Sequence, residues 1–597
     1  MRGITGMGGL GAGYGRWLCV GVAAAAVGVA VALGLAPAGR AVELQRQLRR
    51  PVALCVDPAG DWLYVACRES GTLCVVDLHR QEVAAEHRVG QHLADVQWLP
   101  GTRKLLAVDE AAHELLVLLA QGREVQVVSR VPVNAYPVTV LAAPDGTYAT
   151  VASLWSRRLA RVDLDDVPRV RWVLDLPIAP RGQLWLQEHG RLLVADAFGG
   201  RLALVDPGRG VVADWRQLPA HNIRGLGLAR DGQLLLVAHQ MLNDLAHSIR
   251  NDIHWGLLMS NDLRWLKVES LLAGGDRLYR GGHMHPLGDA GRGGADPGGL
   301  AVAPDGTVVV ALSGVHEVAF GKEEDFSMQR RKVGRRPTAV AIDPQGRWAF
   351  VANTLDDSLS LLDLTSGEVT QTVVLGPAPP LTLAQRGELL FYDARLSHDG
   401  WMSCHSCHTD GHSNAQMNDN FSDRSFNSPK RVLPLGGVKE TLPLAWNGQV
   451  ASLRQQIQNS VTGTMQRDDP LPREEVEALV AYLQTLEPPP PLDVARGAVD
   501  PQAVARGQAV FQRHDCARCH TPPTYTSPEA YDVGLADSQG ARRFNPPSLR
   551  GVSQRDRWLH DSRAQTLEEV FLLHGHPSDT AYSAEEVRDL VAFLRTL

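Results

Sequence analysis

Two short cysteine and histidine motifs contain the residues of this chain best suited to do chemistry. Residues 404–408 read CHSCH and residues 516–520 read CARCH. Two thiols three positions apart on one turn can form thioethers to the vinyl groups of a haem, and the adjacent histidine can bind the iron. Zinc would need a closed set of four ligands, which neither motif supplies. The spacing therefore predicts two c-type haems, attached through Cys404, Cys407, Cys516 and Cys519, with His408 and His520 as proximal iron ligands.

Helical periodicity surrounds both motifs and is expected to position them. The stretches EEVEALVAYLQTL and AEEVRDLVAFLRTL place apolar residues at the spacing of an amphipathic helix. Four consecutive prolines at 488–491 separate the two halves and are typical of a stiff linker. The sequence thus predicts two mainly α cytochrome c domains, 384–487 and 494–597, joined by a proline linker at 488–493.

The region before residue 377 has a different pattern, which predicts strands. An apolar strand, a Gly-containing turn and two more strands recur, as in VALCVDPAGDWLYVACRESGTLCVVDL and TAVAIDPQGRWAFVANTLDDSLSLLDL. Copies begin near residues 51, 93, 137, 181, 223, 298 and 337. Short strands repeated at about 40 residues are typical of propeller blades, each of which needs neighbours to bury its faces. We expect an all-β, seven-bladed propeller over 51–376, and its copies resemble the YVTN-type propeller family.

The fifth copy is longer than the others and contains an insert at about 239–297. The insert holds five histidines, namely His239, His247, His254, His283 and His285. Histidines can bind a metal, but these spacings match no closed ligand pattern. Two interpretations stay open, a metal site and a plain loop that packs on the cytochrome domains.

The first 41 residues predict export. Arg2 and Arg16 precede an uncharged stretch at 17–39 that is rich in Ala, Val and Gly. Such a segment is either a cleaved signal peptide or an uncleaved N-terminal membrane anchor, because about 20 apolar residues can span a bilayer. In both cases we expect the rest of the chain in the periplasm or at the cell surface.

Charge and cysteine content narrow the function further. The net charge is −7 and there is no long basic run, which argues against a nucleic acid partner. Cys55, Cys67 and Cys74 lie close together, and export permits disulfides. Three cysteines allow at most one bridge among themselves, and buried free thiols are the alternative.

The sequence around the two motifs resembles a known family. The stretches ELLFYDARLSHDGWMSCHSCH, ARGQAVFQRHDCARCHTPP, FNPPSLRGV and WLHDSRAQTLEEVFLLH resemble, in this order, the bacterial di-haem cytochrome c peroxidases and their amine-dehydrogenase-maturation relatives. The resemblance covers roughly 384–597, and the fusion to a propeller departs from the simple family. It implies that the first haem is reactive, that the second supplies electrons, and that the partners are a redox protein and hydrogen peroxide.

The resemblance also implies roles for residues near the second haem. Trp446, in WNGQ, matches the family's tryptophan between the two haems. The position of the donor haem's sixth ligand falls on His574, with His576 as the alternative. No methionine follows residue 520, so a methionine ligand from this half is excluded. His560, in WLHD, is expected to support the haem as a neighbour of its ligands or propionates.

Around the first haem the resemblance is less complete. Asn427, in NSP, matches an asparagine that helps to bind a calcium ion in several relatives. Gln456 matches a glutamine of the peroxidases, but ten positions later, where they carry a catalytic glutamate, this chain has Gln466. An amide cannot exchange a proton as a carboxylate does. His412 or Met417 could cap the first iron, which would prevent it from binding peroxide.

Two functions from different classes therefore remain. The first is an oxidoreductase, either a di-haem peroxidase or a peroxide-driven oxidase of a protein, with the propeller as docking domain. The second is a non-enzymatic electron-transfer or surface-binding cytochrome. The family pattern favours the enzyme, and the glutamine at 466 favours the carrier.

Overall fold

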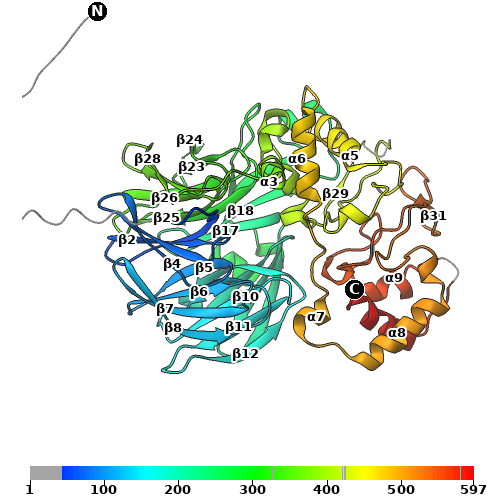
Figure 1. The fold of residues 1–597 in the computed structure, drawn as a ribbon, viewed down its shortest axis with the longest axis horizontal. Coiled ribbons are helices and arrows are strands. Elements are labelled where there is room, and N and C mark those ends of the chain that lie inside the picture. The colour runs from blue at the N-terminus through cyan, green and yellow to red at the C-terminus, as the bar shows by residue number, and fades with distance from the viewer. Residues whose placement is uncertain (1–43, 326, 420, 422–424, 578–579) are drawn as a thin grey trace, which may run out of the picture. The chain divides into compact units, whose positions relative to one another are not determined.

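The computed structural model describes residues 44–325, 327–419, 421, 425–577 and 580–597. The predicted signal or anchor segment, 1–41, lies outside the described residues. Within the described ranges, no helix has both the length and the apolar character needed to cross a bilayer. Figure 1 shows strands from blue to green along the first part of the chain and helices from yellow to red along the rest.

Seven four-stranded antiparallel sheets form a seven-bladed propeller. The first four blades are β1 (Pro51–Val56), β2 (Trp62–Cys67), β3 (Thr72–Asp77) and β4 (Glu82–Arg88); β5 (Leu93–Leu99), β6 (Lys104–Asp109), β7 (Glu114–Gln121) and β8 (Glu124–Pro132); β9 (Pro137–Ala142), β10 (Tyr148–Ser153), β11 (Arg158–Asp163) and β12 (Arg169–Asp175); and β13 (Pro180–Leu186), β14 (Arg191–Asp196), β15 (Arg201–Asp206) and β16 (Val211–Gln217). The last three are β17 (His221–Leu228), β18 (Leu234–Leu242), β19 (Met259–Lys267) and β20 (His283–Pro286); β21 (Pro297–Val302), β22 (Val308–Leu312), β23 (Glu317–Gly321) and β24 (Gln329–Lys332); and β25 (Pro337–Ile342), β26 (Trp348–Asn353), β27 (Ser358–Asp363) and β28 (Glu368–Val374).

The recurring Asp-Pro turn explains why the copies fold alike. In the first blade the Asp57 carboxylate accepts hydrogen bonds from the backbone N–H groups of Asp61 and Trp62, both at 2.8 Å. In the seventh blade Asp343 accepts from Trp348 N at 2.5 Å in the same way. The carboxylate therefore closes the turn between the first two strands of a blade, as aspartate does in Asx-type turns.

The first and last blades close the ring without exchanging a strand. The hydroxyl of Thr354, after β26, donates to the carbonyl of Pro51 on β1 at 2.7 Å. The backbone N–H groups of Arg49 and Arg50 donate to the Asp357 carboxylate at 3.0 and 2.7 Å. Apolar side chains from both blades share one core cluster, including Leu63 and Phe350. Each blade can thus consist of four consecutive strands.

The fifth blade corrects the prediction of an insert at 239–297. β18 and β19 pair in register over nine residues each, from Leu234 opposite Lys267 to Leu242 opposite Met259. The long spacing thus comes from longer strands and from the connections 243–258 and 268–282, which contain the short helices α1 (Arg250–His254) and α2 (Val268–Ala273). His239 is a buried strand residue and not part of a loop, and β20 carries the histidines of the HMHP sequence.

The cysteines of the first blade are free thiols. Cys67 and Cys74 are buried on neighbouring strands, with their sulfurs 3.5 Å apart. Cys55 lies on β1 opposite Tyr64, outside this pair. If a bridge forms among the three, Cys67 and Cys74 are the pair that the fold brings together.

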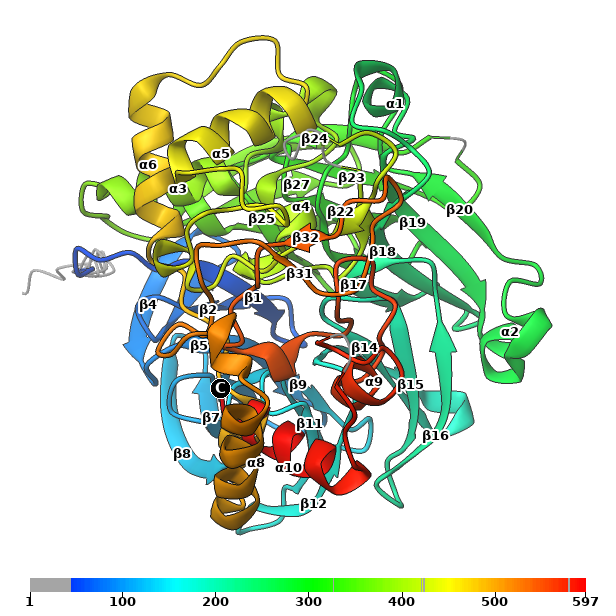
Figure 2. The same ribbon diagram turned by 90° about the vertical axis from the view of Figure 1, so that its right-hand side faces the viewer.

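The chain after the propeller forms two helical units, called here the first (382–488) and second (492–597) cytochrome halves. In the first, α3 (Leu383–Phe391) crosses α6 (Arg473–Leu483) so closely that a Cβ on Gly387 would lie 1.9 Å from the carbonyl oxygen of Ala478. In the second, α8 (Pro501–Arg513) crosses α10 (Ala584–Leu594) in the same way at Gly507 (Figure 2). Only glycine permits such a close backbone approach. The two halves therefore have the same type of helix crossing.

Shorter elements complete the two halves. They are α4 (Cys404–Cys407), α5 (Leu453–Asn459), α7 (Leu492–Arg496), α9 (Leu567–Leu572), β29 (Met417–Asn418), β30 (Lys430–Arg431), β31 (Tyr531–Asp532) and β32 (Arg543–Phe544). The prolines at 488–491 are extended, and α7 begins directly after them, inside the segment expected as linker.

Candidate haem sites and the propeller contacts that hold them

A cavity of about 270 Å³, lined by residues of both cytochrome halves, contains the first motif. Cys404, Cys407 and His408 line it, at the end of α4. His408 Nδ1 donates to the carbonyl of Leu433 at 2.9 Å, which leaves Nε2 for a metal. Burial lowers the pKa of His408 to about 4. The imidazole is therefore neutral at physiological pH, as a metal ligand must be.

The charges of this cavity fit a haem. Its lining includes Lys430, Arg431, Arg550 and Arg555, whereas no carboxylate of the described residues lines it. Within the described chain, Nε and Nη2 of Arg550 and Nε of Arg555 are buried without a hydrogen-bond partner. Burial, reinforced by the charge of Arg555, lowers the pKa of Arg431 to about 9. The two propionates of a haem would supply the missing acceptors and negative charges.

Of the two glutamines predicted to act in catalysis, only one lines the cavity. Gln456 lines the cavity. Gln466 does not, because its amide donates to the carbonyls of Ser248 and Gly463 at 2.9 and 2.5 Å. The π-helical turn at Ser460–Thr464 precedes a left-handed residue at 466, with φ of 55°, and brings buried Met465 into the lining instead.

Neither predicted cap of the first iron lines the cavity. The His412 ring packs against Trp155 and Phe198 of the propeller, with ring centres 5.5 and 4.9 Å apart. Its Nε2 donates to the carbonyl of Gln554 in the second half at 3.2 Å. Met417 lies in β29, paired with Arg431. The structure therefore does not support a cap by either residue, and His412 instead joins three parts of the chain.

Trp446 lies at the boundary between the two halves. It lines the cavity, and its indole N–H donates to the carbonyl of Arg431 at 2.8 Å. Its ring centre lies 6.4 Å from that of Phe544 and 6.3 Å from that of His560, both in the second half. An aromatic ring at this boundary is where the resemblance expects a bridge between two haems.

The second motif faces a histidine across a short gap. His520 Nδ1 donates to the carbonyl of Tyr525 at 3.1 Å, which again leaves Nε2 for a metal. The centre of its ring lies 6.4 Å from that of His576. Both His574 Nε2 and His576 Nδ1 are buried without a partner among the described residues. Of the two, it is His576 whose ring lies against His520, so the geometry favours the alternative ligand over His574.

A buried ion pair lies near Asn427, the residue predicted to bind calcium. Asn427 is exposed, and its backbone N–H donates to the Asp419 carboxylate at 2.8 Å. Nearby, Lys430 Nζ lies 3.2 Å from the Asp537 carboxylate of the second half. The side chains of Lys430 and Asp537 are only 8% and 4% exposed. This boundary thus already contains a buried cation with a carboxylate partner.

The propeller holds the first motif from outside. The buried carboxylate of Asp296, between β20 and β21, accepts hydrogen bonds from the hydroxyls of Ser403 and Ser406, both at 2.6 Å. His221 and Asn222 donate to the carbonyl of Ser406 at 3.2 and 3.3 Å. Since Ser406 lies between the two cysteines of the motif, the propeller fixes the turn that carries them. Sequence reasoning missed these residues because nothing local marks them.

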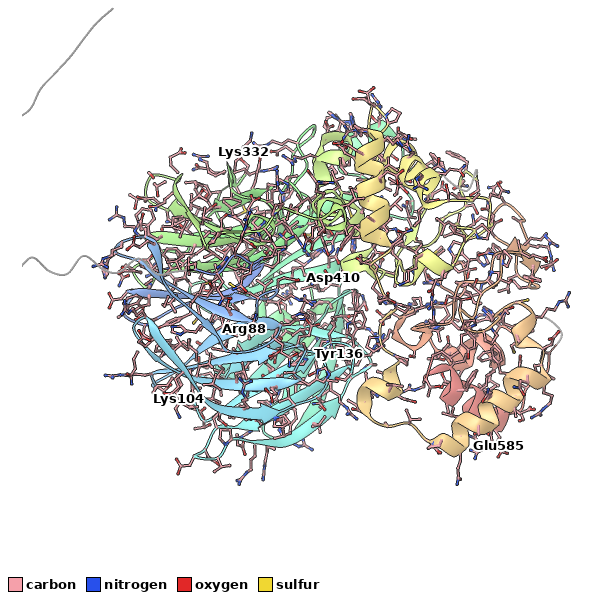
Figure 3. All side chains as sticks on the ribbon, viewed as in Figure 1. Arg88, Lys104, Tyr136, Lys332, Asp410 and Glu585 are labelled. Atoms are coloured by element: carbon pink, nitrogen blue, oxygen red, sulfur yellow. The ribbon has the colours of Figure 1, made fainter. Side chains whose placement is uncertain are left out.

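Asp410 forms a second tether just after the motif (Figure 3). Its carboxylate lies 2.8 Å from Arg224, 3.3 Å from Arg181 and 3.8 Å from Arg336, which come from three blades. Although burial opposes it, the arginines, Arg224 foremost, hold the pKa of Asp410 well below its usual range. The ionised carboxylate therefore ties the first half to the propeller.

The second half has its own contact with the propeller. Arg157 Nη2 donates to the carbonyl of Gln554 at 2.6 Å, and its Nε donates to the Gln554 side chain at 3.1 Å. Asp556 lies 3.3 Å from the same guanidinium. Both cytochrome halves therefore rest on the propeller through buried polar contacts.

Comparison with known proteins agrees with this arrangement. Residues 382–488 match the family model described as di-haem cytochrome c peroxidase. Residues 504–597 match the model described as cytochrome c. The chain carries a di-haem cytochrome c peroxidase domain and a cytochrome c domain behind a seven-bladed propeller.

Individual relatives match less than half of this chain. The methylamine utilization protein MauG of Methylophilus methylotrophus is 26% identical over an alignment of 296 residues, and the match covers 37% of this chain and 85% of the relative. The cytochrome c551 peroxidase of Nitrosomonas europaea is 22% identical over an alignment of 308 residues, and the match covers 42% of this chain and 91% of that protein.

Solved structures match about half of this chain. The Kuenenia stuttgartiensis hydrazine synthase matches with a TM-score of 0.46 and 18% identity, over 54% of this chain and 97% of that chain. Virginiamycin B lyase from Staphylococcus aureus matches with a TM-score of 0.39 and 11% identity, over 51% and 92% of the two chains.

Proposed function

We propose that this chain is an exported di-haem c-type cytochrome that acts as a peroxidase-like oxidoreductase, with a second redox protein as partner. The observation that carries the proposal is the cavity in which Cys404, Cys407 and His408 face Gln456. When bound there, a haem supplies one-electron redox chemistry and, where its iron is open, a site for peroxide. The similarity to a cytochrome c551 peroxidase and to MauG supports the same class of reaction.

The chain's own residues have distinct tasks in this proposal. His408 and His520 bind the two irons, each with its Nδ1 proton held by a backbone carbonyl, which fixes the tautomer and the ring. Gln456 can orient a small ligand in the cavity by hydrogen bonds, but as an amide it cannot take up and release a proton. Trp446 provides an aromatic path between the halves.

The propeller also holds the first haem motif in place, and this limits where a partner protein can dock on it. Asp296 and Arg224 bind the loop that carries the first motif, so part of the propeller is covered by the cytochrome halves. We propose that a redox partner docks on the remaining surface of the propeller or on the exposed side of the halves. Calcium at Asn427 stays a prediction, which chelation tests.

A second candidate is a non-enzymatic electron carrier. Two features of the cavity favour it, namely that no carboxylate of the described residues lines it and that Met465 does. A methionine in the wall could serve as a sixth ligand, and a six-coordinate iron transfers electrons without binding peroxide.

Electron paramagnetic resonance of the purified haem-loaded protein separates the two candidates. Spectra of the oxidised and half-reduced forms are recorded before and after addition of hydrogen peroxide. The oxidoreductase predicts one high-spin ferric signal that peroxide abolishes. Two low-spin signals that peroxide leaves unchanged in both forms would overturn it in favour of the carrier.

A further inference from the structure

Three metal-binding side chains converge where the fifth blade meets the first cytochrome half. His254, the last residue of α1, places Nδ1 2.8 Å from Oδ2 of Asp399. His398 places Nε2 3.4 Å from the same oxygen. The three ligand atoms all lie within 4.8 Å of one another. The two histidines are 144 positions apart in the sequence, so only the fold brings them together.

Backbone contacts hold the ligands in place. The N–H of Gly293 donates to the carbonyl of Asp399 at 2.6 Å, and the N–H of Gly291 donates to the carbonyl of His254 at 3.2 Å. The segment 291–293 thus forms hydrogen bonds to the backbone of both His254 and Asp399. Asp399 has a left-handed backbone with φ of 59°, which aspartate tolerates better than most residues.

We propose that His254, His398 and Asp399 bind one divalent transition-metal ion of the zinc class. Metal–ligand bonds of about 2.0–2.1 Å in a tetrahedron place the ligand atoms roughly 3.3 Å apart. The separations of the two histidine nitrogens from Asp399 Oδ2, 2.8 and 3.4 Å, fall near this value. Two neutral imidazoles and one carboxylate also form a donor set that zinc prefers over calcium or magnesium.

The exposure of the cluster indicates an open coordination position. The side chains of His254, His398 and Asp399 are 42%, 23% and 21% exposed. Water therefore reaches the cluster from one side and can occupy the fourth position of a bound ion. A fully enclosed structural site would instead supply a fourth protein ligand.

The ion would add a third tether between the propeller and the first haem motif. Asp399 lies five residues before Cys404, and the Trp401 ring between them packs on the backbone of Gly256, next to α1. A metal held by His254 and Asp399 would thus fix the fifth blade against the segment that enters α4. Asp296 and Asp410 act at other positions, because they contact Ser403, Ser406 and the propeller arginines.

Zinc binding to the full-length, haem-loaded protein tests the proposal. After treatment with EDTA and removal of the chelator, calorimetric titration with zinc chloride and elemental analysis give the stoichiometry and affinity. We expect one zinc ion per chain, and a loss of affinity of about 100-fold or more in His254→Ala and His398→Ala, because even residues behind metal ligands contribute 10- to 100-fold.

His283→Ala is the matched control, since His283 belongs to the same blade but stacks on Trp265. It should bind zinc as the parent protein does. Circular dichroism and the haem absorption spectrum verify that each variant is folded. The proposal is overturned if the parent protein takes up no zinc, if binding survives both His254→Ala and His398→Ala, or if it depends on His283.

Discussion

The imidazole rings of His520 and His576 lie next to each other beside the second haem motif, with their centres 6.4 Å apart and their planes at 69°. Two imidazoles bound on opposite sides of one metal, at metal–nitrogen distances of about 2.0 Å, place their ring centres roughly 6 Å apart. The spacing therefore suits a pair of axial ligands. Histidine in place of methionine lowers the reduction potential of a haem, so the second haem is expected to be a low-potential electron donor.

Replacing His576 by methionine should raise the potential of the second haem. We expect an increase on the order of 100 mV, a fraction of the roughly 0.8 V that axial ligands span. Spectroelectrochemical titration measures it, and near-infrared magnetic circular dichroism identifies the new ligand. His574→Ala is the matched control and should leave the potential unchanged. If His574→Ala shifts the potential and His576→Met does not, the ligand is His574, as the family resemblance implies.

Placing a carboxylate in the cavity that contains the first haem motif should increase peroxidase activity. Gln456 lines that cavity, whereas Gln466 is turned away and bonded to Ser248 and Gly463. Since general acid–base groups contribute about 10²–10⁴-fold, we expect Gln456→Glu to raise peroxide turnover by about 100-fold. Steady-state oxidation of a reduced dye by peroxide measures the rate. A larger gain from Gln466→Glu would show that the loop adopts another conformation in the working protein.

The residues that could be predicted lie in short sequence motifs, whereas the residues that were missed do not. His408 and His520 follow from five-residue motifs, and the blades follow from turns such as that at Asp57. Whether Met465 or Gln466 enters the cavity depends on one π-helical turn, and such a shift by one residue has no sequence pattern of its own.

Contacts between segments far apart in the sequence could not be predicted either, because no sequence pattern marks them. Asp296 and Ser403 are 107 positions apart, and neither belongs to a motif. His412 lies close to the first motif in sequence, which made it a candidate ligand. In the fold its ring packs on the propeller instead, because Trp155 and Phe198 offer an apolar surface there.

Removing the Asp296 carboxylate should loosen the first haem motif. Asp296→Ala leaves the hydroxyls of Ser403 and Ser406 without their buried acceptor. We expect a loss of about 1–3 kcal/mol, seen as an earlier thermal transition of the haem absorption band. Asp305→Ala, in an exposed turn of the next blade, is the control. Equal melting of the two variants would mean that the propeller does not stabilise the motif.

Calcium chelation should leave the boundary between the halves intact. Lys430 Nζ already neutralises Asp537 there, so EGTA is expected to change neither the melting temperature nor the haem spectrum. Lys430→Met, in contrast, leaves a buried carboxylate uncompensated and should cost about 3–5 kcal/mol. Melting curves with and without EGTA measure both effects. A clear loss of stability in EGTA alone would instead support calcium at Asn427.

Stability should fall as the pH rises toward neutrality, in part because of Asp196. This buried residue at the end of β14 faces the second half, and burial, together with the nearby charge of Asp556, raises its pKa to about 7. A raised pKa means that the folded state binds the proton more tightly than the unfolded state does. The resulting stabilisation is complete below the unfolded pKa near 3.8 and is lost as the pH rises through about 7.

Asp196→Asn should remove this loss while keeping the oxygen that accepts from Phe198 N. We expect a melting temperature about 1–3 °C higher than that of the parent protein at pH 8, and no difference below about pH 4. Asp95, whose pKa burial also raises to about 7, remains in this variant and leaves a residual slope. Calorimetric melts across this pH range, with Asp95→Asn and the double variant alongside, separate the two contributions. An unchanged slope in Asp196→Asn would mean that Asp196 is already ionised in the folded protein.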